Sequence, residues 1–304
     1  MKRYSFLMLA LLLAVAAQAQ ALFVGSYNIR NHNSEDDSNG NVWSVRCKVL
    51  CDQMNFENPD IFGTQEVLDH QLHDLLNGLD GYGYVGVGRD DGKTAGEYAA
   101  IFYKKERLQL LRSGNFWLNE TPDVPKLGWD AACVRICSWG EFKLKGTKLK
   151  FYYFNLHMDH VGTTARREGA KLVVAKIKEI AKGAPVVLTG DFNVDQTDEI
   201  YTIFTTSGVL KDSYECCKFR FAENGTFNSF NSDLKTASRI DHVFVSPNFD
   251  VQRYGVLTDT YWTAVENADE QKGHDAPKEI RFKKHQRRTI SDHYPVLVKM
   301  NYRK

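Results

Sequence analysis

The sequence has little proline, little cysteine and no surplus of charge of either sign. Only 7 of its 304 residues are proline and no segment is of low complexity, so it predicts no linker. The six cysteines form three close pairs, which are too few and too local to indicate a disulfide framework. A mainly disordered chain is excluded because 43% of the residues are hydrophobic and 12% are aromatic. We therefore expect a large hydrophobic core to stabilise the fold.

The first 19 residues have the pattern of a secretory signal peptide. Lys2 and Arg3 precede an uncharged apolar stretch that ends in a small-x-small site at Ala17 and Ala19. The alternative is a transmembrane anchor, but the stretch is shorter than the roughly 20 residues that a membrane-spanning helix needs. We expect residues 1–19 to be removed and residues 20–304 to form one exported domain that is periplasmic, cell-surface or extracellular. Such a domain would have no integral membrane association after cleavage.

The charge balance argues against general binding of nucleic acid, but one short segment is strongly basic. Without Lys2 and Arg3, 37 of the 39 basic residues remain against 38 acidic ones, so the expected mature chain is nearly neutral. This balance argues against a protein that binds phosphate backbones mainly through a basic surface. However, six of the eleven residues from 278 to 288 are basic. This segment is either a basic loop at the mouth of a phosphate site or a solvated loop.

Hydrophobic periodicity predicts an α/β protein. Apolar patterns indicate strands over residues 22–29, 60–64, 83–87, 99–103, 108–111, 134–142, 149–156, 185–189, 240–245, 251–257 and 294–300. Helical spacing indicates helices over residues 42–56, 71–79, 164–181 and 197–207. The middle strands resemble an antiparallel meander, between two halves in which strands and helices alternate. We expect a four-layer α/β sandwich in which helices flank two packed mixed β-sheets.

Polar side chains lie at the ends of several of these strands. They are Asn28, Glu66, His157, Asp191, Asn193, Asp241, Asp292 and His293. A single Asp or Asn at such a position is more often a turn residue or a helix cap than a catalyst. A cluster of carboxylates with two histidines, in contrast, needs a cation or an anionic substrate to be stable. The pattern therefore predicts one site built from several strand ends.

Six blocks in order carry a family resemblance. They read SYNI at 26–29, TQEV at 64–67, NLHMDH at 155–160, GDFN at 190–193, RIDHVFV at 239–245 and SDHYPV at 291–296. Together they resemble the endonuclease/exonuclease/phosphatase superfamily, which includes DNase I, abasic-site endonucleases, neutral sphingomyelinases, inositol polyphosphate 5-phosphatases and deadenylases. The resemblance is closest to the exported bacterial branch. It implies a DNase I-like sandwich and a metal-dependent hydrolase that acts on phosphoester bonds.

The residue types suggest a metal site and a general base. Glu66 is a hard oxygen ligand suited to Mg²⁺ or Mn²⁺. Asn28 is placed to bind the ion or a metal-bound water, and Asp292 to bind the metal from the side opposite Glu66. A histidine that deprotonates water works best with a carboxylate on its other nitrogen. We therefore predict that His293, oriented by Asp241, is the general base.

Other residues have roles around the phosphate. Asp191 and Asn193 are predicted to position the attacking water and to hydrogen-bond a phosphoryl oxygen. His157 would donate a hydrogen bond or a proton to the phosphate or the leaving group, or else be an ordinary buried histidine. The resemblance implies that Glu97 supports His157 and that Tyr103 lies at the cleft edge. For Tyr103, ordinary strand packing is an equal alternative.

Four arginines are less clearly placed by the sequence. Arg46, Arg135 and Arg166 are candidates to contact a substrate anion, and surface salt bridging is the alternative for each. Arg30 stands where abasic-site endonucleases carry an aspartate. This departure argues against a role in DNA repair and against a second metal at that position.

Two hypotheses of function follow. The first is a metal-dependent phosphoesterase that hydrolyses a phosphodiester or phosphomonoester by in-line attack of an activated water. Its substrate is a nucleic acid, a phospholipid or sphingolipid headgroup, or a sugar phosphate. The second is a non-catalytic binding protein on the same scaffold, which is disfavoured because His293, Asp241 and Glu66 are all present. We expect a monomer.

Overall fold

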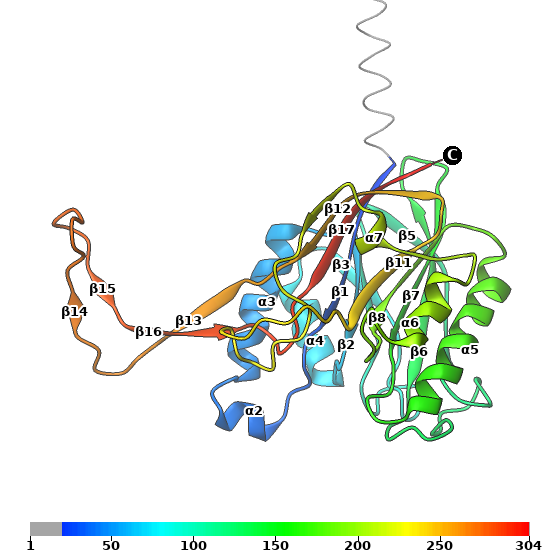
Figure 1. Cartoon of the computed structure of the whole chain (residues 1–304), viewed down its shortest axis with the longest axis horizontal. Coiled ribbons are helices and arrows are strands. Elements are labelled where there is room, and N and C mark those ends of the chain that lie inside the picture. The colour runs from blue at the N-terminus through cyan, green and yellow to red at the C-terminus, as the bar shows by residue number, and fades with distance from the viewer. Residues whose placement is uncertain (1–19, 304) are drawn as a thin grey trace, which may run out of the picture.

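Two mixed sheets form the centre of the computed structural model, which describes residues 20–303 (Figure 1). In order, the 7-stranded sheet consists of β10 (Phe219–Phe221), β12 (Phe249–Val256), β17 (Val296–Tyr302), β1 (Ala21–Asn28), β2 (Ile61–Gln65), β4 (Ile101–Lys104) and β3 (Tyr82–Val85). The 6-stranded sheet consists of β5 (Leu108–Trp117), β6 (Ile136–Leu144), β7 (Lys150–His157), β8 (Val186–Asp191), β11 (Asp241–Val245) and β9 (Lys211–Asp212).

Helices cover the outer face of each sheet. In Figure 1, α3 (Trp43–Glu57) and α4 (Asp69–Gly78) lie beside the first sheet, and α5 (Thr163–Ala181) and α6 (Glu199–Thr205) beside the second. Two shorter helices, α2 (Ser34–Ser38) and α7 (Ser213–Cys216), lie in connections. The larger buried apolar clusters match the three interfaces between layers: one between the sheets, and one between each sheet and its helices. The predicted four-layer α/β sandwich is confirmed.

The central strands are apolar because both of their faces are covered. Every residue of β8 is buried, as are all residues of β7 except its two ends. A strand that is buried on both faces reads as a continuous apolar run rather than an alternating one. The charged side chains of β7 and β8 lie at the strand ends, whereas Asn155 and Thr189 inside these strands are buried and hydrogen-bonded. The carboxylates and histidines of the site are therefore confined to the ends.

Strand direction and register bring these ends together. β1 runs parallel to β2, and β7 runs parallel to β8, so each pair ends at the same edge. β11 is antiparallel to β8 and begins where β8 ends, since Asp241 pairs with Asp191, which also pairs with His157. β17 is antiparallel to β1 and therefore begins at this edge. The polar strand ends of both sheets meet at the end of the sandwich away from the C-terminus (Figure 1).

The expected antiparallel meander is divided between the two sheets. β3 and β4 belong to the first sheet, whereas β5, β6 and β7 form consecutive antiparallel neighbours in the second. The chain crosses between sheets in the short turn between β4 and β5. β5 also continues to Trp117, past the predicted end at residue 111. Local patterns indicate that neighbouring strands pair, but they do not say to which sheet a strand belongs.

A two-stranded arm projects from the sandwich and was not predicted (Figure 1). It consists of β13 (Thr260–Ala264) paired with β16 (His285–Thr289), and of β14 (Glu270–Gln271) paired with β15 (Phe282–Lys283). The arm contains most of the basic segment at residues 278–288, in which every residue is exposed except Arg288. No residue of this segment lines the cavity described below. Of the two alternatives for this segment, the structure therefore agrees with a solvated loop rather than a basic loop at the mouth of the site.

The predicted signal peptide lies outside the described residues. Within residues 20–303, no helix combines the length and the apolar character needed to cross a membrane.

Candidate active site

Three residues within two positions of a strand end turn the chain sharply. Glu66 follows β2, while Arg30 and Asn193 each lie two residues past the ends of β1 and β8. All three have left-handed backbones, with φ angles of 62°, 59° and 50° respectively. This conformation costs roughly 1–2 kcal/mol in a non-glycine residue, and such strain concentrates at functional sites. The turns direct polar side chains into the space between the ends of the two sheets.

Asn28 links carboxylates that come from both sheets. Its side chain is fully buried, and its Nδ2 lies 3.0 Å from Glu66 Oε1 and 3.0 Å from Asp191 Oδ2. The same nitrogen lies 3.4 Å from His293 Nε2, while Asn28 Oδ1 accepts a bond from the backbone of Arg30. In this orientation Asn28 presents hydrogen-bond donors to the site. The structure thus places it as a residue that fixes the carboxylates, with its oxygen turned to the backbone.

Glu66 and Asp292 form a pair of carboxylates suited to a cation. Arg30 Nη1 lies 3.9 Å from Glu66 Oε2 and 3.7 Å from Asp292 Oδ2. Burial raises the pKa of Asp292, and the negative charge of Glu66 raises it further. Buried carboxylates that repel one another are stabilised by a divalent ion, and Mg²⁺ and Mn²⁺ prefer oxygen ligands of this kind. The donor set therefore fits the expected metal.

His293 and Asp241 form the expected dyad. His293 Nδ1 lies 2.8 Å from Asp241 Oδ2, and both side chains are buried. Burial by itself lowers the pKa of His293, but the negative charges of Asp241, Asp191 and Asp292 outweigh it and raise that pKa well above its usual value. The surrounding carboxylates therefore favour the protonated form of His293. For His293 to act as a base, a positive charge nearby must lower its pKa. Glu66 and Asp292 are suited to hold a cation that supplies this charge.

Asp191 lies between the two histidines. Its Oδ2 is 3.7 Å from His293 Nε2 and 3.5 Å from His157 Nε2. Burial, followed by the negative charge of Asp241, raises the pKa of Asp191 to about 7. Its other oxygen, Oδ1, accepts a bond of 3.0 Å from the backbone N–H of Asn193. Asp191 can therefore exchange a proton near neutral pH.

His157 is held as a neutral imidazole. Burial lowers its pKa well below the usual value, and the positive charges of Arg135 and Arg89 lower it further. Asn193 Nδ2 lies 3.2 Å from Nε2, whereas Nδ1 is buried without a hydrogen-bond partner among the described residues. Glu97 Oε2 is 3.9 Å from Nδ1 and is paired instead with the guanidinium of Arg89. Glu97 thus lies beside His157 without a direct hydrogen bond to it.

A cavity of about 410 Å³ opens over this cluster. It is lined by Arg30, Asn31, Glu66, Arg89, Glu97, Cys133, Arg135, His157, His160, Asp191, Asn193, Phe227, Ile240, Asp292 and His293. Sequence reasoning did not single out Asn31, Arg89, Cys133, His160, Phe227 or Ile240 as site residues. Two of them carried a signal, because His160 and Ile240 belong to the six sequence blocks. The others come from loops, whose paths depend on tertiary contacts.

Five predicted site residues do not line the cavity. Asn28 and Asp241 lie behind the lining, in contact with Glu66 and His293, and the other three make different contacts. Tyr103 packs between the sheets with its ring 5.1 Å from that of Phe142, so the strand-packing alternative describes it. Arg46 is fully buried and donates hydrogen bonds to backbone carbonyls, including those of Asn41 and Ile29, which excludes contact with a substrate. Arg166 donates to the carbonyl of Asp159 and does not line the cavity. Arg135 is therefore the one predicted anion-binding arginine that reaches it.

The fold and this set of side chains define a class of enzyme: an α/β-sandwich hydrolase that acts on phosphoester bonds. Comparison with known families agrees, since residues 25–293 match the model of the Endonuclease/Exonuclease/phosphatase family. The chain belongs to this family.

Two solved structures from Bacteroides thetaiotaomicron are similar over nearly the whole chain. One is a protein of the same family, 51% identical, with a TM-score of 0.86, covering 93% of this chain and 98% of its own. The other is a mannosyl-6-phosphatase, also 51% identical, with a TM-score of 0.85, covering 92% of this chain and 100% of its own. A more distant relative is the exoribonuclease subunit Ccr4 of Debaryomyces hansenii, which is 23% identical over 66% of this chain. This chain spans 28% of the length of that relative.

Proposed function

We propose that this enzyme is a divalent-metal-dependent phosphomonoesterase whose substrates are sugar phosphates. The observation that carries the proposal is the cavity of about 410 Å³, which contains Arg30, Arg89 and Arg135 besides the carboxylates. A site of this size suits a small molecule. Arg30 and Arg89 suit the two negative charges of a phosphomonoester. The mannosyl-6-phosphatase, 51% identical to this chain, supports a sugar as the alcohol part.

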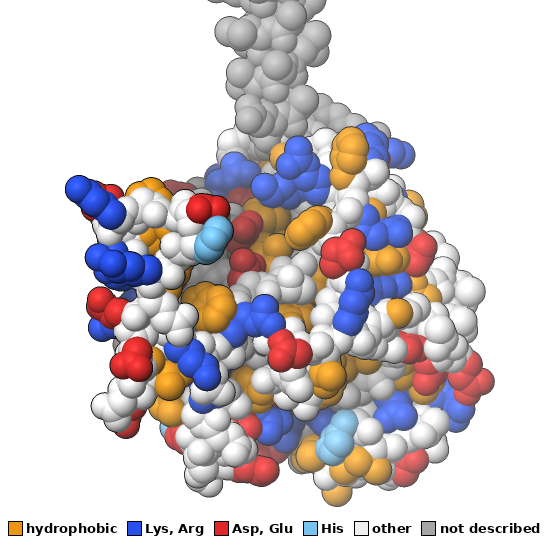
Figure 2. All heavy atoms as spheres, turned by 60° about the vertical axis from the view of Figure 1, so that its left-hand side comes forward, with side chains coloured by type: hydrophobic (Ala, Val, Ile, Leu, Met, Phe, Trp, Pro, Cys, Tyr) orange, Lys and Arg blue, Asp and Glu red, His pale blue; other side chains and the backbone are white. Residues whose placement is uncertain are grey.

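The surface charge supports a small substrate over nucleic acid. On the face shown in Figure 2, Lys and Arg side chains of the described residues are interspersed with Asp and Glu. A protein that binds nucleic acid in general needs a continuous basic footprint along the phosphate backbone. The near balance of 39 basic and 38 acidic residues in the whole chain agrees with this argument.

The proposed mechanism begins with the His293–Asp241 dyad. Asp241 accepts the Nδ1 hydrogen of His293 and thereby turns Nε2 toward the attacking water. In its neutral form, His293 removes a proton from this water, which attacks phosphorus in line with the leaving oxygen. A divalent ion held by Glu66 and Asp292 would stabilise charge on the phosphoryl oxygens and lower the pKa of His293.

His157 and Asn193 act on the other side of the phosphoryl group. The low pKa of His157 keeps it neutral; with substrate bound, its hydrogen is on Nε2, which donates it to the leaving oxygen in place of the contact with Asn193 Nδ2. Asn193 is fixed by a 2.9 Å bond from Nδ2 to the carbonyl of Met158, and together with Asp191 it positions the water and a phosphoryl oxygen. The products are inorganic phosphate and the free alcohol of the sugar.

A hydrolysis panel tests the proposal. Residues 20–304 would be assayed for phosphate release from mannose 6-phosphate and glucose 6-phosphate, and for cleavage of bis-p-nitrophenyl phosphate, RNA, plasmid DNA and sphingomyelin. Each assay is run with Mg²⁺, Mn²⁺ or EDTA. Glu66→Gln is the inactive variant, and Glu179→Gln, an exposed position on α5, is its matched control.

The outcomes separate the alternatives. Phosphate release from a sugar phosphate that is lost with EDTA and with Glu66→Gln, but not with Glu179→Gln, would support the proposal. Cleavage of the diesters with no phosphate release from either sugar phosphate would refute the proposal that the substrates are sugar phosphates. Silence on every substrate by folded protein that binds Mg²⁺ would favour the non-catalytic binding protein.

We also propose that residues 1–19 direct export and are removed, and that the mature protein is a monomer. Amino-terminal sequencing of protein from the periplasm and the medium of an expressing cell tests the first statement. A mature chain that begins before residue 20 would contradict it. Light scattering during size-exclusion chromatography tests the second.

A further inference from the structure

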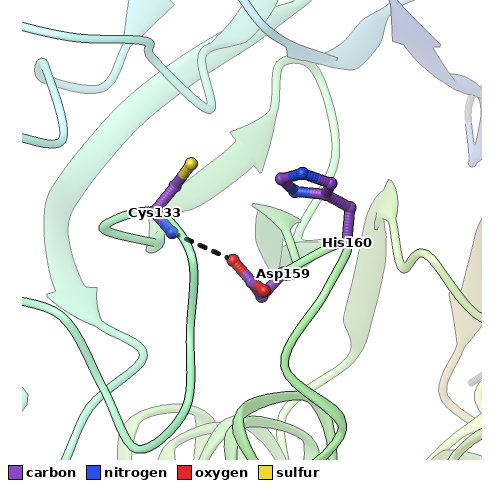
Figure 3. A group of neighbouring side chains, drawn as sticks. All are labelled: Cys133, Asp159 and His160. Carbon is purple, nitrogen blue, oxygen red and sulfur yellow. Dashed lines mark hydrogen bonds between the residues drawn. The ribbon is translucent and has the colours of Figure 1, made fainter.

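Two loops wall the cavity on the His157 side. The loop before β6 provides Cys133 and Arg135, and the loop after β7 provides Asp159 and His160. Figure 3 shows that the Cys133 thiol and the His160 ring project to the same side, above the Asp159 carboxylate. Cys133, Arg135 and His160 all line the cavity. We call these four residues the 133–160 wall.

Asp159 makes this wall rigid. Its side chain is buried, and its two oxygens accept hydrogen bonds from five N–H groups. The donors are the backbones of Ala132, Cys133, Val161 and Gly162, and the Nε of Arg135. The carboxylate therefore ties the two loops to each other, and the wall is ordered before any substrate binds.

The same bonds argue against a metal at this cluster. Ligand atoms of Cys133, Asp159 and His160 lie within 4.8 Å of one another, which is compatible with a metal site. However, the oxygens of Asp159 are occupied by N–H donors, and Arg135 Nη2 lies 3.0 Å from His160 Nδ1. A cationic donor at this nitrogen competes with a metal ion. The cluster is instead a preformed set of hydrogen-bonding groups.

These groups are directed at the cavity. Because Nδ1 of His160 accepts from Arg135, its Nε2 carries the hydrogen and is a donor. The His160 ring is exposed, whereas Arg135 is 5% exposed and its guanidinium has further N–H groups beyond the two that bond Asp159 and His160. Glu97 and Asn31, which also line the cavity, provide acceptors.

The His293 side of the cavity has a different character. It includes Phe227, which forms a backbone bridge with His293 and is 42% exposed as a residue. Ile240 lies in the same lining. A pyranose ring has an apolar C–H face and an edge of hydroxyl groups, so it needs one apolar surface and one polar surface. The cavity supplies both beside the phosphate position.

We propose that the 133–160 wall binds the hydroxyl groups of the sugar that leaves, with His160 and Arg135 as the contacting residues and Asp159 as the positioning residue. Phe227 covers the apolar face of the ring. This inference rests on the proposed function and adds to it the residues that select a sugar over other alcohols. It places the sugar next to His157, which hydrogen-bonds the leaving oxygen.

The test compares two monoesters that differ in the alcohol. Mannose 6-phosphate presents hydroxyl groups to the wall, whereas phenyl phosphate presents none. We expect His160→Ala to lower the ratio of kcat/KM for mannose 6-phosphate to that for phenyl phosphate by about five- to tenfold, as for one lost hydrogen bond. The loss should appear mainly in KM. His160→Gln, which keeps a donor, should restore part of the ratio.

The matched control is His73→Ala, an exposed histidine on α4 that does not line the cavity. This control should leave the ratio unchanged. If His160→Ala changes both substrates by the same factor or neither, the proposed function stands and the assignment of the wall is wrong. If the wild-type enzyme hydrolyses phenyl phosphate but neither mannose 6-phosphate nor glucose 6-phosphate, the proposed function and this inference fail together.

Discussion

Replacing Asp159 with Asn should destabilise the protein by about 2 kcal/mol at neutral pH. Burial by itself raises the pKa of Asp159, but backbone hydrogen bonds from Gly162, Val161 and Ala132, with the charge of Arg135, outweigh it and hold the pKa at about 2 instead of 3.8. One unit of pKa difference corresponds to about 1.4 kcal/mol. The carboxylate is thus worth about 2 kcal/mol to the folded state.

The sign of the pH dependence follows from the lowered pKa. The stabilisation is complete above the unfolded pKa of about 4, and it is lost as pH falls toward the folded value of about 2. Asn cannot titrate, so the difference between wild type and Asp159→Asn should shrink to about half when the pH is lowered from 7 to 3. Neutral Asn also presents an NH₂ group to N–H donors, which weakens the tie between the two loops.

Urea unfolding followed by tryptophan fluorescence at pH 7 and pH 3 measures this effect. Asp52→Asn is the control, since the Asp52 side chain is 65% exposed and its one ion pair among residues 20–303 is with Lys48. Its effect should stay below about 0.5 kcal/mol at both pH values. The reasoning is refuted if Asp159→Asn is as stable as wild type at pH 7, or if its deficit does not depend on pH.

Other substitutions test individual roles. Glu66→Gln should abolish the response of activity to added Mg²⁺, and a variant that still responds would remove Glu66 from the metal site. His293→Ala should lower kcat by about 10²–10⁴-fold with little change in Tm, and near-normal turnover would exclude it as the base. In Asp241→Asn, loss of the negative charge lowers the pKa of His293, so the acid limb of the kcat/KM profile should move to lower pH; an unchanged limb would contradict the dyad. Arg46→Ala should lower the free energy of unfolding by about 3 kcal/mol, because buried carbonyls lose their donor. An unchanged Tm with a raised KM would contradict its structural placement.

The sequence indicated most of the layered fold because buried elements have strong patterns. β8 is a continuous apolar run, and α5 repeats apolar residues at helical spacing on the face that packs against the sheet. β5 was cut short because the residues from Gln109 to Asn115 are largely half-buried or exposed. The arm of β13 and β16 was missed for a related reason, since these strands are mostly exposed and pair with each other.

The polar strand ends could be located because strand direction decides where they meet. Asn28, His157 and Asp191 end or follow strands that run the same way within their sheets. Arg89 and His160 lie on loops, and a sequence does not reveal how a loop is tied down, as Asp159 does here. For Tyr103 the resemblance implied the cleft edge, with strand packing as an equal alternative, and its strand turns that side chain toward the space between the sheets.

The left-handed backbones and crowded carboxylates of the site oppose folding. Glu66 is held in a strained conformation, and the pKa of Asp191 is raised to about 7, which means that its charged form is less stable in the folded protein than in the unfolded chain. The burial of the Asp191 charge is therefore a cost to folding that the site imposes. Folding stability therefore does not account for the charge and the backbone strain of these residues. Inactive relatives on this scaffold should accordingly be more heat-stable than active ones.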